Sequence, residues 1–447
     1  MSWGHAVCKD LVRWESKGIG IHYKEDTKEF LFSGSAVYDV NNTSGFGTAE
    51  NPPVVAIFTS FYSEPTTHPD GTKVEQGTQS QSIANSTDKG NTWQFYDKNP
   101  VIRSPPEWYA TEFREFRDPK VFWYAPHNKW VMVTMLAQKK KALFWTSQNL
   151  KDWTVMSEFS SRFTPDGVWE CPDIFKLNIS GQNESKWVLL VSANPGGVAK
   201  GFGMHYYIGD FDGYRFTEET DEKYHHIKWL DYGSDFYAAI SWNNVDTGRY
   251  LVAWIDNWEY AYATHDEYKG AIGFVRELSL ITVDGTITVS QKPVGTLANY
   301  IKEKKQYSLE DVRTGVEILM NKAYELIIEL SDIGESGFIF VLQDDKNNVE
   351  AEIKYGDEGK TLSIRKKNRD PKVPEKYVMH YAPYKKNILE NRETLRIFID
   401  SNTLALFSTR GDVAFTELLI SYAEKRKFYL KEGGKINVNL TRQLLEF

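Results

Sequence analysis

The stretch Asp88-Lys89-Gly90-Asn91-Thr92-Trp93 is a polar turn closed by an aromatic residue, and its recurrence decides the fold. Related stretches are Lys9-Asp10-Leu11-Val12-Arg13-Trp14, Gln148-Asn149-Leu150-Lys151-Asp152-Trp153 and the degenerate Gly209-Asp210-Phe211-Asp212-Gly213-Tyr214. The closing aromatic residues lie at positions 14, 93, 153 and 214, at spacings of 79, 60 and 61 residues. A period near sixty residues, with several strands per unit, is typical of propeller blades. The alternative is a set of ordinary hairpin turns that share a preference for Asp and Gly.

Short strands are predicted through the first three-fifths of the chain. Runs rich in Val, Ile, Phe and Trp and bounded by Gly, Asn, Asp and Pro are strand signals, and they occur at 54–58, 129–135, 187–191 and 250–254. Convincing amphipathic helices are nearly absent, which predicts an all-β architecture. After residue 312, strictly alternating strands predict a β-sandwich.

The chain is therefore expected to divide into a propeller at residues 1–295, a linker at 296–312 and a sandwich at 313–447. The segment Tyr300-Ile301-Lys302-Glu303-Lys304-Lys305 is mostly charged and shows no strand alternation. It is predicted to be a charged linker or a short helix. A length of 447 residues fits about two or three domains.

Composition excludes several functional classes. The net charge of −8 is spread along the chain, whereas nucleic-acid binding needs a concentrated basic face. No stretch is apolar for long enough to span a bilayer, and no leader peptide precedes the first motif. Two distant cysteines, Cys8 and Cys171, predict neither a disulfide framework nor a metal site, and Cys171 is expected to be a buried thiol. The oligomeric state is left open.

Two segments carry candidate chemistry, Glu115-Phe116-Arg117-Asp118-Pro119-Lys120 and Trp169-Glu170-Cys171-Pro172-Asp173. Each places a carboxylate near an aromatic residue and a proline at the end of a predicted strand. Glycoside hydrolysis needs such a pair, one carboxyl to protonate the leaving oxygen and another to attack carbon or activate water. Trp169 and Pro172 are expected to shield Glu170 and raise its pKa, while Arg117 keeps Asp118 ionised. The alternative is a turn with a structural ion pair.

Further motifs in the same order make the chain resemble glycoside hydrolase family 32, the invertase, inulinase and levanase group. They cover nearly the whole chain. The quoted stretches are Trp3-Gly4-His5-Ala6, Phe32-Ser33-Gly34-Ser35, Phe116-Arg117-Asp118-Pro119-Lys120-Val121-Phe122, Trp169-Glu170-Cys171-Pro172-Asp173, Asp235-Phe236-Tyr237-Ala238-Ala239, Trp254 to Trp258 with Tyr260, Arg276-Glu277-Leu278-Ser279-Leu280 and Leu395-Arg396-Ile397-Phe398-Ile399-Asp400.

The resemblance implies a five-bladed propeller followed by a β-sandwich, and retaining hydrolysis of terminal fructose from sucrose, inulin or levan. It makes Glu170 the general acid/base and Asp118 the transition-state stabiliser, which holds fructose hydroxyls together with Arg117. The residues that it implies for substrate binding, besides Arg117, are Phe32, Ser33, Asp235 and Trp258. It implies no metal and no organic cofactor, and a secreted protein once the amino-terminal region is restored.

One departure from the family pattern concerns the nucleophile. The family's nucleophile is an Asp in a Trp-Met-Asn-Asp-Pro-Asn-Gly motif a few dozen residues before Trp-Gly-His-Ala, which here lies at residues 3–6. The first blade is therefore expected to be incomplete, and the chain as given is expected to be weakly active or inactive. The alternatives are a non-catalytic fructan-binding remnant and a fructosyltransferase. The residues do not separate a preference for sucrose, inulin or levan.

Overall fold

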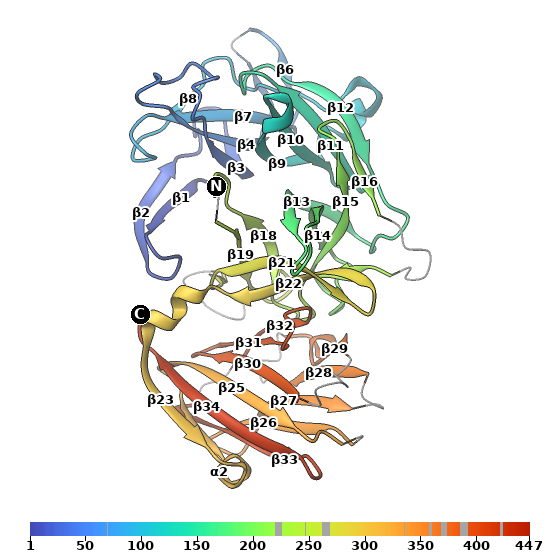
Figure 1. The fold of residues 1–447 in the computed structure, drawn as a ribbon. Helices are drawn as coiled ribbons and strands as arrows, with labels where there is room; N and C mark the ends of the chain where they lie inside the picture. Colours follow the sequence, from blue (N-terminus) through green and yellow to red (C-terminus); the bar gives the residue numbers. More distant parts are fainter. Residues whose placement is uncertain are drawn as a thin grey trace. The chain divides into compact units, whose positions relative to one another are not determined.

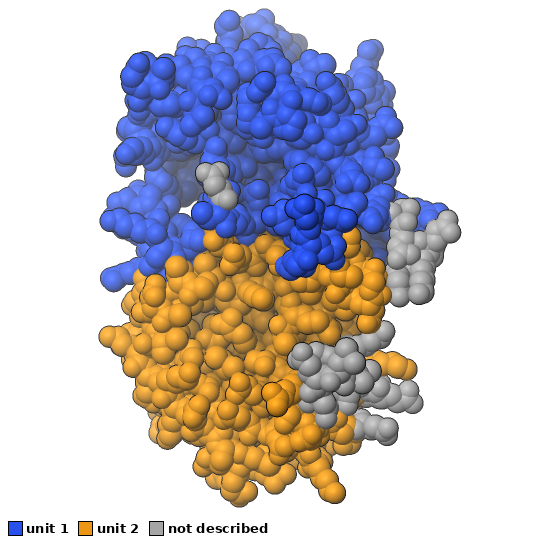
Figure 2. Space-filling model, viewed as in Figure 1, with its two compact units in different colours: residues 1–193, 206–227, 240–249 blue, residues 194–205, 228–239, 250–447 orange. Residues whose placement is uncertain are grey.

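The computed structural model describes residues 1–68, 70–219, 226–245, 247–261, 269–334, 336–356, 360–367, 373–384, 392–420 and 423–447. These residues are mostly in antiparallel β-strands (Figure 1), as expected from the sequence. They form two compact units (Figure 2): unit 1 is residues 1–193, 206–227 and 240–249, and unit 2 is residues 194–205, 228–239 and 250–447. No helix among the described residues has the length and apolar character that a membrane span requires.

Unit 1 begins with the two-stranded hairpin of β1 (Trp3–Cys8) and β2 (Trp14–Ile21). Sheets follow in which spatial order equals chain order. The next sheet contains β3 (Glu29–Tyr38), β4 (Val54–Tyr62), β7 (Gln79–Ser86) and β8 (Gln94–Phe95). The one after it contains β9 (Phe116–Tyr124), β10 (Lys129–Leu136), β11 (Lys141–Ser147) and β12 (Thr154–Phe159). The third contains β13 (Val168–Asn178), β14 (Ser185–Asn194), β15 (Gly203–Phe211) and β16 (Phe216–Glu218).

Apolar clusters join each of these sheets to the next. One cluster links β2 to β3 and β4 and includes Ile21 and Phe58. A second links β4 and β7 to β9, β10 and β11 and includes Ile57 and Val121. A third links β10 and β11 to β13, β14 and β15 and includes Phe144. Successive antiparallel sheets that share their cores in this way are packed like the blades of a β-propeller.

The predicted turn repeat is confirmed in its local geometry. Asp10, Asn149 and Asp212 each accept, through one side-chain oxygen, the backbone N–H groups of the residues two and three positions on, and Asp88 accepts from Thr92. The residue after each has a positive φ, between 62° and 93°. Three of these turns join the third strand of a sheet to its last strand, and the first turn joins β1 to β2. The β1–β2 hairpin thus matches the outer hairpins of the next three sheets.

A further sheet has the order β18-β19-β21-β22, with β20 beside β19. Its strands are β18 (Tyr237–Ser241), β19 (Arg249–Ile255), β20 (Ala271–Ile272), β21 (Arg276–Val283) and β22 (Thr286–Pro293). The remaining short elements before residue 301 are β5 (Thr66–Thr67), β6 (Lys73–Val74), β17 (Lys228–Trp229), and the 3₁₀ helices η1 (Glu107–Glu112), η2 (Ala125–His127) and η3 (Gly295–Tyr300).

The rest of unit 2 contains two six-stranded antiparallel sheets. The first contains, in spatial order, β23 (Ile301–Tyr307), β34 (Asn437–Leu445), β25 (Ala323–Ser331), β30 (Arg392–Ile399), β31 (Thr403–Phe407) and β32 (Ala414–Leu418). The second contains β24 (Val316–Leu319), β33 (Lys425–Glu432), β26 (Phe338–Asp344), β27 (Val349–Gly356), β28 (Thr361–Lys366) and β29 (Met379–Pro383). The helix α2 (Leu309–Thr314) and the 3₁₀ helix η4 (Glu375–Tyr377) complete the described elements.

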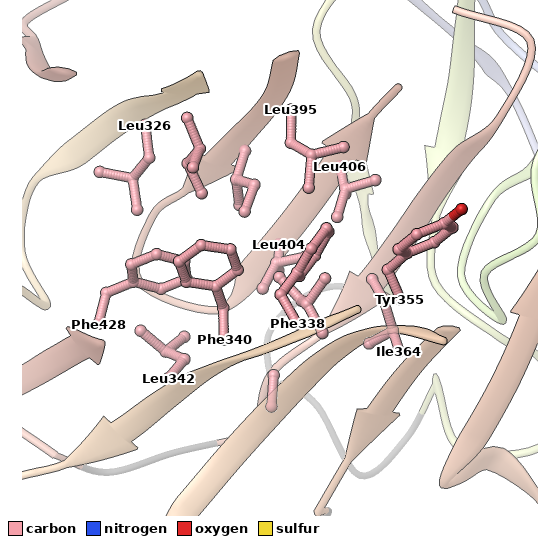
Figure 3. Packing of buried hydrophobic residues seen from close by; sticks show 14 of the residues in the cluster. Leu326, Phe338, Phe340, Leu342, Tyr355, Ile364, Leu395, Leu404, Leu406 and Phe428 are labelled. Atoms are coloured by element: carbon pink, nitrogen blue, oxygen red, sulfur yellow. The ribbon is translucent and has the colours of Figure 1, made fainter. Parts of the chain in front are cut away.

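One buried cluster fills the space between these two sheets (Figure 3). Leu326 and Leu395 reach it from the first sheet, and Phe340 and Phe428 from the second, where their rings stack with centroids 5.4 Å apart. Each fully buried Leu or Phe side chain contributes about 1.5–3 kcal/mol of transfer free energy. The predicted sandwich is therefore present, because strand alternation directs every second side chain into a shared core.

The expectation of a charged linker or short helix is wrong for residues 301–307. They form β23, an edge strand that pairs with β34 over Ile301–Tyr307. The side chains from 302 to 306 are exposed, and Glu303 pairs with Arg442 at 3.0 Å. Charged side chains are common on edge strands because they discourage further strand pairing. The strand therefore lacks the alternation of apolar and polar residues by which strands were predicted from the sequence.

The Asx turn between β11 and β12 can be tested with Asn149→Ala. The change removes bonds of 3.0 and 2.9 Å to the amides of Lys151 and Asp152, and we expect it to lower the free energy of unfolding by about 1–2 kcal/mol. The control is Gln148→Ala, since Gln148 is the exposed neighbour. Thermal and urea unfolding, followed by tryptophan fluorescence, compare the variants. Equal stability of the two variants would contradict the turn's structural role.

Candidate active site

The first strands of two neighbouring sheets bring the candidate carboxylates together. Asp118 lies on β9 and Glu170 on β13, and these strands are in contact. Asp118 and Cys171 both have positive φ values, 61° and 45°, and the β9–β10 register shifts beside Asp118. Such a backbone conformation in a residue other than glycine costs about 1–2 kcal/mol and is characteristic of functional sites. The Cys171 amide donates a hydrogen bond of 2.9 Å to Oδ2 of Asp118, which joins the two irregular points.

Arg117 holds three carboxylates around one guanidinium group. Its Nη2 lies 3.1 Å from Oε1 of Glu170, its Nη1 lies 2.8 Å from Oε2 of Glu115, and its Nε lies 3.9 Å from Oδ2 of Asp118. Burial by itself would lower the pKa of Arg117, but Asp118 and Glu170 outweigh it and raise that pKa. The guanidinium therefore stays charged and fixes Glu170 beside Asp118.

The Asp118 carboxyl is nearly inaccessible, with 6% of its side chain exposed. Burial raises its pKa to about 6, Arg117 opposes that shift, and the negative charge of Glu170 adds to it. The sequence suggested only the effect of Arg117. That effect is present, but desolvation is larger, so the net shift of the Asp118 pKa is upward. On folding, the carboxylate loses its hydrating water and gains few hydrogen-bond donors in return. At neutral pH the group remains mostly ionised.

Glu170 is less shielded than the sequence suggested. Its side chain keeps 20% of its surface exposed, while the neighbouring Trp169 is fully buried in an apolar cluster. The Trp169 ring thus anchors β13 in the sheet core instead of covering the carboxyl. An accessible carboxyl beside a buried one is a suitable arrangement for a group that must exchange protons with substrate and water. Cys171 is partly exposed as a residue, but burial of its thiol raises the pKa of that group, in line with the expected buried thiol.

Phe32 and Ser33 lie on an irregular part of β3, where the register with β4 shifts between Leu31 and Gly34. The Phe32 ring stacks on Phe61 with centroids 4.5 Å apart and an interplanar angle of 6°. Ser33 is exposed, and its side chain opposes the rise in the pKa of the Cys171 thiol that burial causes. Both residues lie on β3, a strand in contact with β9, which carries Asp118. Their roles in substrate binding stay predictions.

A set of buried polar side chains supports this neighbourhood and was missed from the sequence. The Asp118 amide donates to Oγ1 of Thr59 at 2.9 Å, Thr59 donates to Gln81, and Gln81 donates to the carbonyl of Phe116. Gln79 accepts a hydrogen bond of 3.3 Å from Arg117. The available signal was Gln79-Ser80-Gln81-Ser82, four polar residues that lie inside a strand and are buried. Buried polar groups require partners, so such a run indicates a supported site.

Asp235 and Trp258 belong to unit 2. Asp235 is fully buried, and its carboxylate accepts hydrogen bonds from Lys366 at 2.6 Å, from Ser234 at 2.8 Å and from Tyr260. Direct contact with a sugar would require one of these partners to move. Trp258 is 52% exposed and packs against Trp254. The roles of both residues in substrate binding stay predictions.

Within the described residues, no group of three or more His, Cys, Asp or Glu side chains is arranged to hold a metal ion. The chemistry available from unit 1 is that of a buried and an accessible carboxyl bridged by one guanidinium.

Comparison with known proteins identifies the family. Residues 1–293 match the model of the glycosyl hydrolases family 32 N-terminal domain. The chain belongs to glycoside hydrolase family 32. This family 32 chain is 42% identical over 319 residues to an extracellular exo-inulinase of Aspergillus niger, a match that covers 69% of this chain and 59% of the relative. It is 36% identical over 451 residues to a levanase of Bacillus subtilis, covering 97% of this chain and 62% of the levanase.

The same family 32 chain superimposes on a solved exo-inulinase structure from Aspergillus awamori with a TM-score of 0.90 and 31% identity, covering 100% of this chain and 90% of that one. The expected propeller-and-sandwich class of fold is supported by this match. The chain spans about three-fifths of the length of the exo-inulinase and levanase relatives, 59% and 62%.

The raised pKa of Asp118 has a consequence for stability. Its pKa is about 6 in the folded protein against an ordinary value of 3.8, so the folded state binds the proton more tightly. Stability then rises as the pH falls from about 6 to about 4, and at pH 7 the ionised group destabilises the fold by at most about 3 kcal/mol. We expect Asp118→Asn to be more stable than the unchanged chain at pH 7 by about 1–3 kcal/mol, with the difference shrinking at pH 4.5.

Urea unfolding at the two pH values measures this difference. Asp166→Asn is the matched control, because Asp166 is an exposed carboxylate in the segment before β13. A destabilised Asp118→Asn variant at pH 7, or a difference that does not change with pH, would show that Asp118 is held without an electrostatic cost.

Proposed function

We propose that this chain carries the sugar-cleaving site of a β-fructofuranosidase, which hydrolyses terminal fructose from sucrose or fructans with retention of configuration. The observation that carries the proposal is the arrangement of Arg117, Asp118 and Glu170. One guanidinium joins a buried and an accessible carboxyl on adjacent strands. All three residues lie within residues 1–293, which match the family 32 model.

Glu170 is the proposed general acid/base. In the first step it gives its proton to the glycosidic oxygen as the bond to the anomeric carbon breaks, and a nucleophilic carboxylate forms a bond to that carbon. In the family pattern that carboxylate comes from the Trp-Met-Asn-Asp-Pro-Asn-Gly motif, which these 447 residues do not contain. In the second step Glu170 takes a proton from water, whose oxygen displaces the nucleophile from the sugar. The exposed 20% of its side chain is consistent with access for both substrate and water.

Asp118 and Arg117 are the proposed stabilisers of the reacting sugar. An ionised carboxylate in a desolvated position forms strong hydrogen bonds to sugar hydroxyls, and these strengthen as positive charge develops on the ring. The stacked Phe32–Phe61 pair and the exposed Ser33 are proposed as the wall of the fructose subsite. Asp235 and Trp258 are proposed to act in substrate binding on the strength of their motifs alone.

The substrate class rests on the relatives. Those similar to this chain are named exo-inulinases and levanases, and a β-fructofuranosidase of Schwanniomyces occidentalis with 26% identity and a TM-score of 0.84 was solved with fructosyl-erythritol. We therefore propose sucrose, inulin or levan as substrate. The name of the extracellular exo-inulinase supports a secreted protein.

The proposed organisation is a five-bladed propeller with an incomplete first blade, at residues 1–295, and a sandwich at 313–447. The end of the family match at residue 293 supports the first boundary. The two-stranded β1–β2 sheet, beside neighbours with four or five strands, supports the incomplete blade. The intervening segment, 296–312, contributes β23 to the sandwich sheet.

Release of fructose tests the proposal. The purified chain is incubated with sucrose, inulin and levan, and initial rates are compared with those of Glu170→Gln and of the control Glu184→Gln, an exposed carboxylate at the far end of the same hairpin. We expect Glu170→Gln to lower kcat by about 10²–10⁴-fold with little change in KM, since only proton transfer is removed. The control should keep its rate. Equal, measurable rates of fructose release in both variants would exclude Glu170 as the acid.

A non-catalytic fructan-binding protein is the second candidate, because these 447 residues contain no Trp-Met-Asn-Asp-Pro-Asn-Gly segment. On their own we propose that they bind fructosides and turn them over weakly or not at all. Calorimetric binding of fructo-oligosaccharides without release of fructose would support this candidate. Hydrolysis at rates typical of enzymes, above about 1 s⁻¹, would contradict it, and oligofructosides formed at high sucrose would indicate fructosyl transfer.

A further inference from the structure

Unit 1 contains a pocket that lies away from the Asp118 and Glu170 carboxylates. It has a volume of ≈ 240 Å³ and is lined by Val37, Phe122, Trp123, Ile174, Phe175, Lys176, Trp187, Asn243, Asn244, Val245 and Arg249. Drug-sized ligands need about 300–1,000 Å³, so this pocket suits a smaller molecule.

The pocket is at the opposite end of the strands that carry the candidate active site. On β9 the site residue is Asp118 and the pocket residue is Phe122, and on β13 they are Glu170 and Ile174. Four residues of extended strand span roughly 13 Å. The pocket is therefore a separate feature of unit 1, and its chemistry does not depend on the proposed hydrolysis.

Among the described residues that line this pocket, the charged side chains are Arg249 and Lys176, and both are positive. Lys176 is exposed at the rim. In the part of the chain that the structure describes, no carboxylate lies within ion-pair distance of Arg249; the nearby Asp173 is taken by Lys120 at 3.2 Å. Burial lowers the pKa of Arg249, and Asp173 offsets this only in part.

Arg249 also has an unused donor. Its Nη1 donates to the Trp242 carbonyl at 2.9 Å and to Ser241 at 3.3 Å, whereas its buried Nε has no hydrogen-bond partner among the described residues. A buried N–H of a charged group is costly to leave unpaired. Protein atoms enclose Nε, so an acceptor in the pocket would reach the guanidinium through its other nitrogens and compensate the charge there.

Residues 242–244, beside this pocket, are held in place before any ligand arrives. The side-chain NH₂ of Asn243 donates to the Ala36 carbonyl at 2.8 Å. The backbone N–H of Tyr38 donates to the side-chain oxygen Oδ1 of Asn244 at 3.0 Å. Trp242 stacks on Trp14 with centroids 5.7 Å apart and an interplanar angle of 13°. The pocket wall is thus preorganised, which lowers the entropic cost of binding.

We propose that this pocket binds a small oxyanion, such as phosphate or sulfate, with Arg249 as the inner, partly buried cation and Lys176 as the exposed cation at its rim. The guanidinium presents its N–H groups to the oxygens, as in other bidentate oxyanion sites. The aromatic side chains Phe122, Trp123 and Trp187 exclude water from the ion.

Isothermal titration of the 447-residue chain with inorganic phosphate, at constant ionic strength near 0.15 M, tests the proposal. We expect saturable binding of one phosphate per chain, competed by sulfate. Arg249→Gln should weaken it at least about tenfold, and Lys176→Gln about two- to fivefold. Lys73→Gln is the matched control, because Lys73 is an exposed lysine of unit 1 outside the pocket, and it should bind as the unchanged chain does.

Arg249→Lys guards against a folding defect, since it keeps the charge and removes the fork of donors. A folded Arg249→Lys variant with weakened phosphate binding supports the proposal. No saturable binding by the unchanged chain would overturn it, and so would an equal loss in Lys73→Gln. A crystal soaked in phosphate that shows only water against the guanidinium of Arg249 would overturn it as well. None of these readouts requires enzymatic activity, so failure of the proposed function leaves the test intact.

Discussion

The hydrogen bond from the Cys171 amide to the Asp118 carboxylate is the constraint around which unit 1 is arranged. It joins two residues in left-handed backbone conformations on neighbouring strands, and each conformation is unfavourable by itself. The surrounding structure must therefore hold both strands in place. It does so through Thr59 and Ser35, whose hydroxyls bond the backbone of β9 at Asp118, Pro119 and Val121. A site built in this way is rigid because three sheets meet in it: β3 and β4 belong to one, β9 to a second and β13 to a third.

The electrostatics of the site follow from the same arrangement. Bringing β9 and β13 together buries Asp118 and places Glu170 near it, so two negative charges share a confined space. Arg117 makes this tolerable by facing Glu170, Glu115 and Asp118 at once. The balance is incomplete, since the pKa of Asp118 remains above its ordinary value. Natural active sites commonly carry such an energetic cost, because groups placed for a ligand are not placed for stability.

The chemistry-bearing residues were accessible from the sequence because each lies in a short contiguous motif. Asp118 and Glu170 were recognised as a pair, and the Asx turns were recognised from Asp, Asn and Gly spacing, since both signals are local. Three features were not accessible. Burial decides the net pKa shift of Asp118, packing decides that Trp169 faces the core, and β34 decides that residues 301–307 form a strand. Each of these features depends on residues distant in sequence, and patterns among neighbouring residues do not reveal them.

The Asx turns have a kinetic consequence. Each is closed by a side chain within a few residues of its own position, so an outer hairpin needs only local contacts and belongs to the class of structures that forms in microseconds. The site contacts span much longer stretches of chain, 53 residues for Cys171 with Asp118 and 84 for Ser35 with Pro119. Closing such loops is slower. We therefore expect the sheets of unit 1 to fold from their outer strands inward, with the carboxylates meeting last.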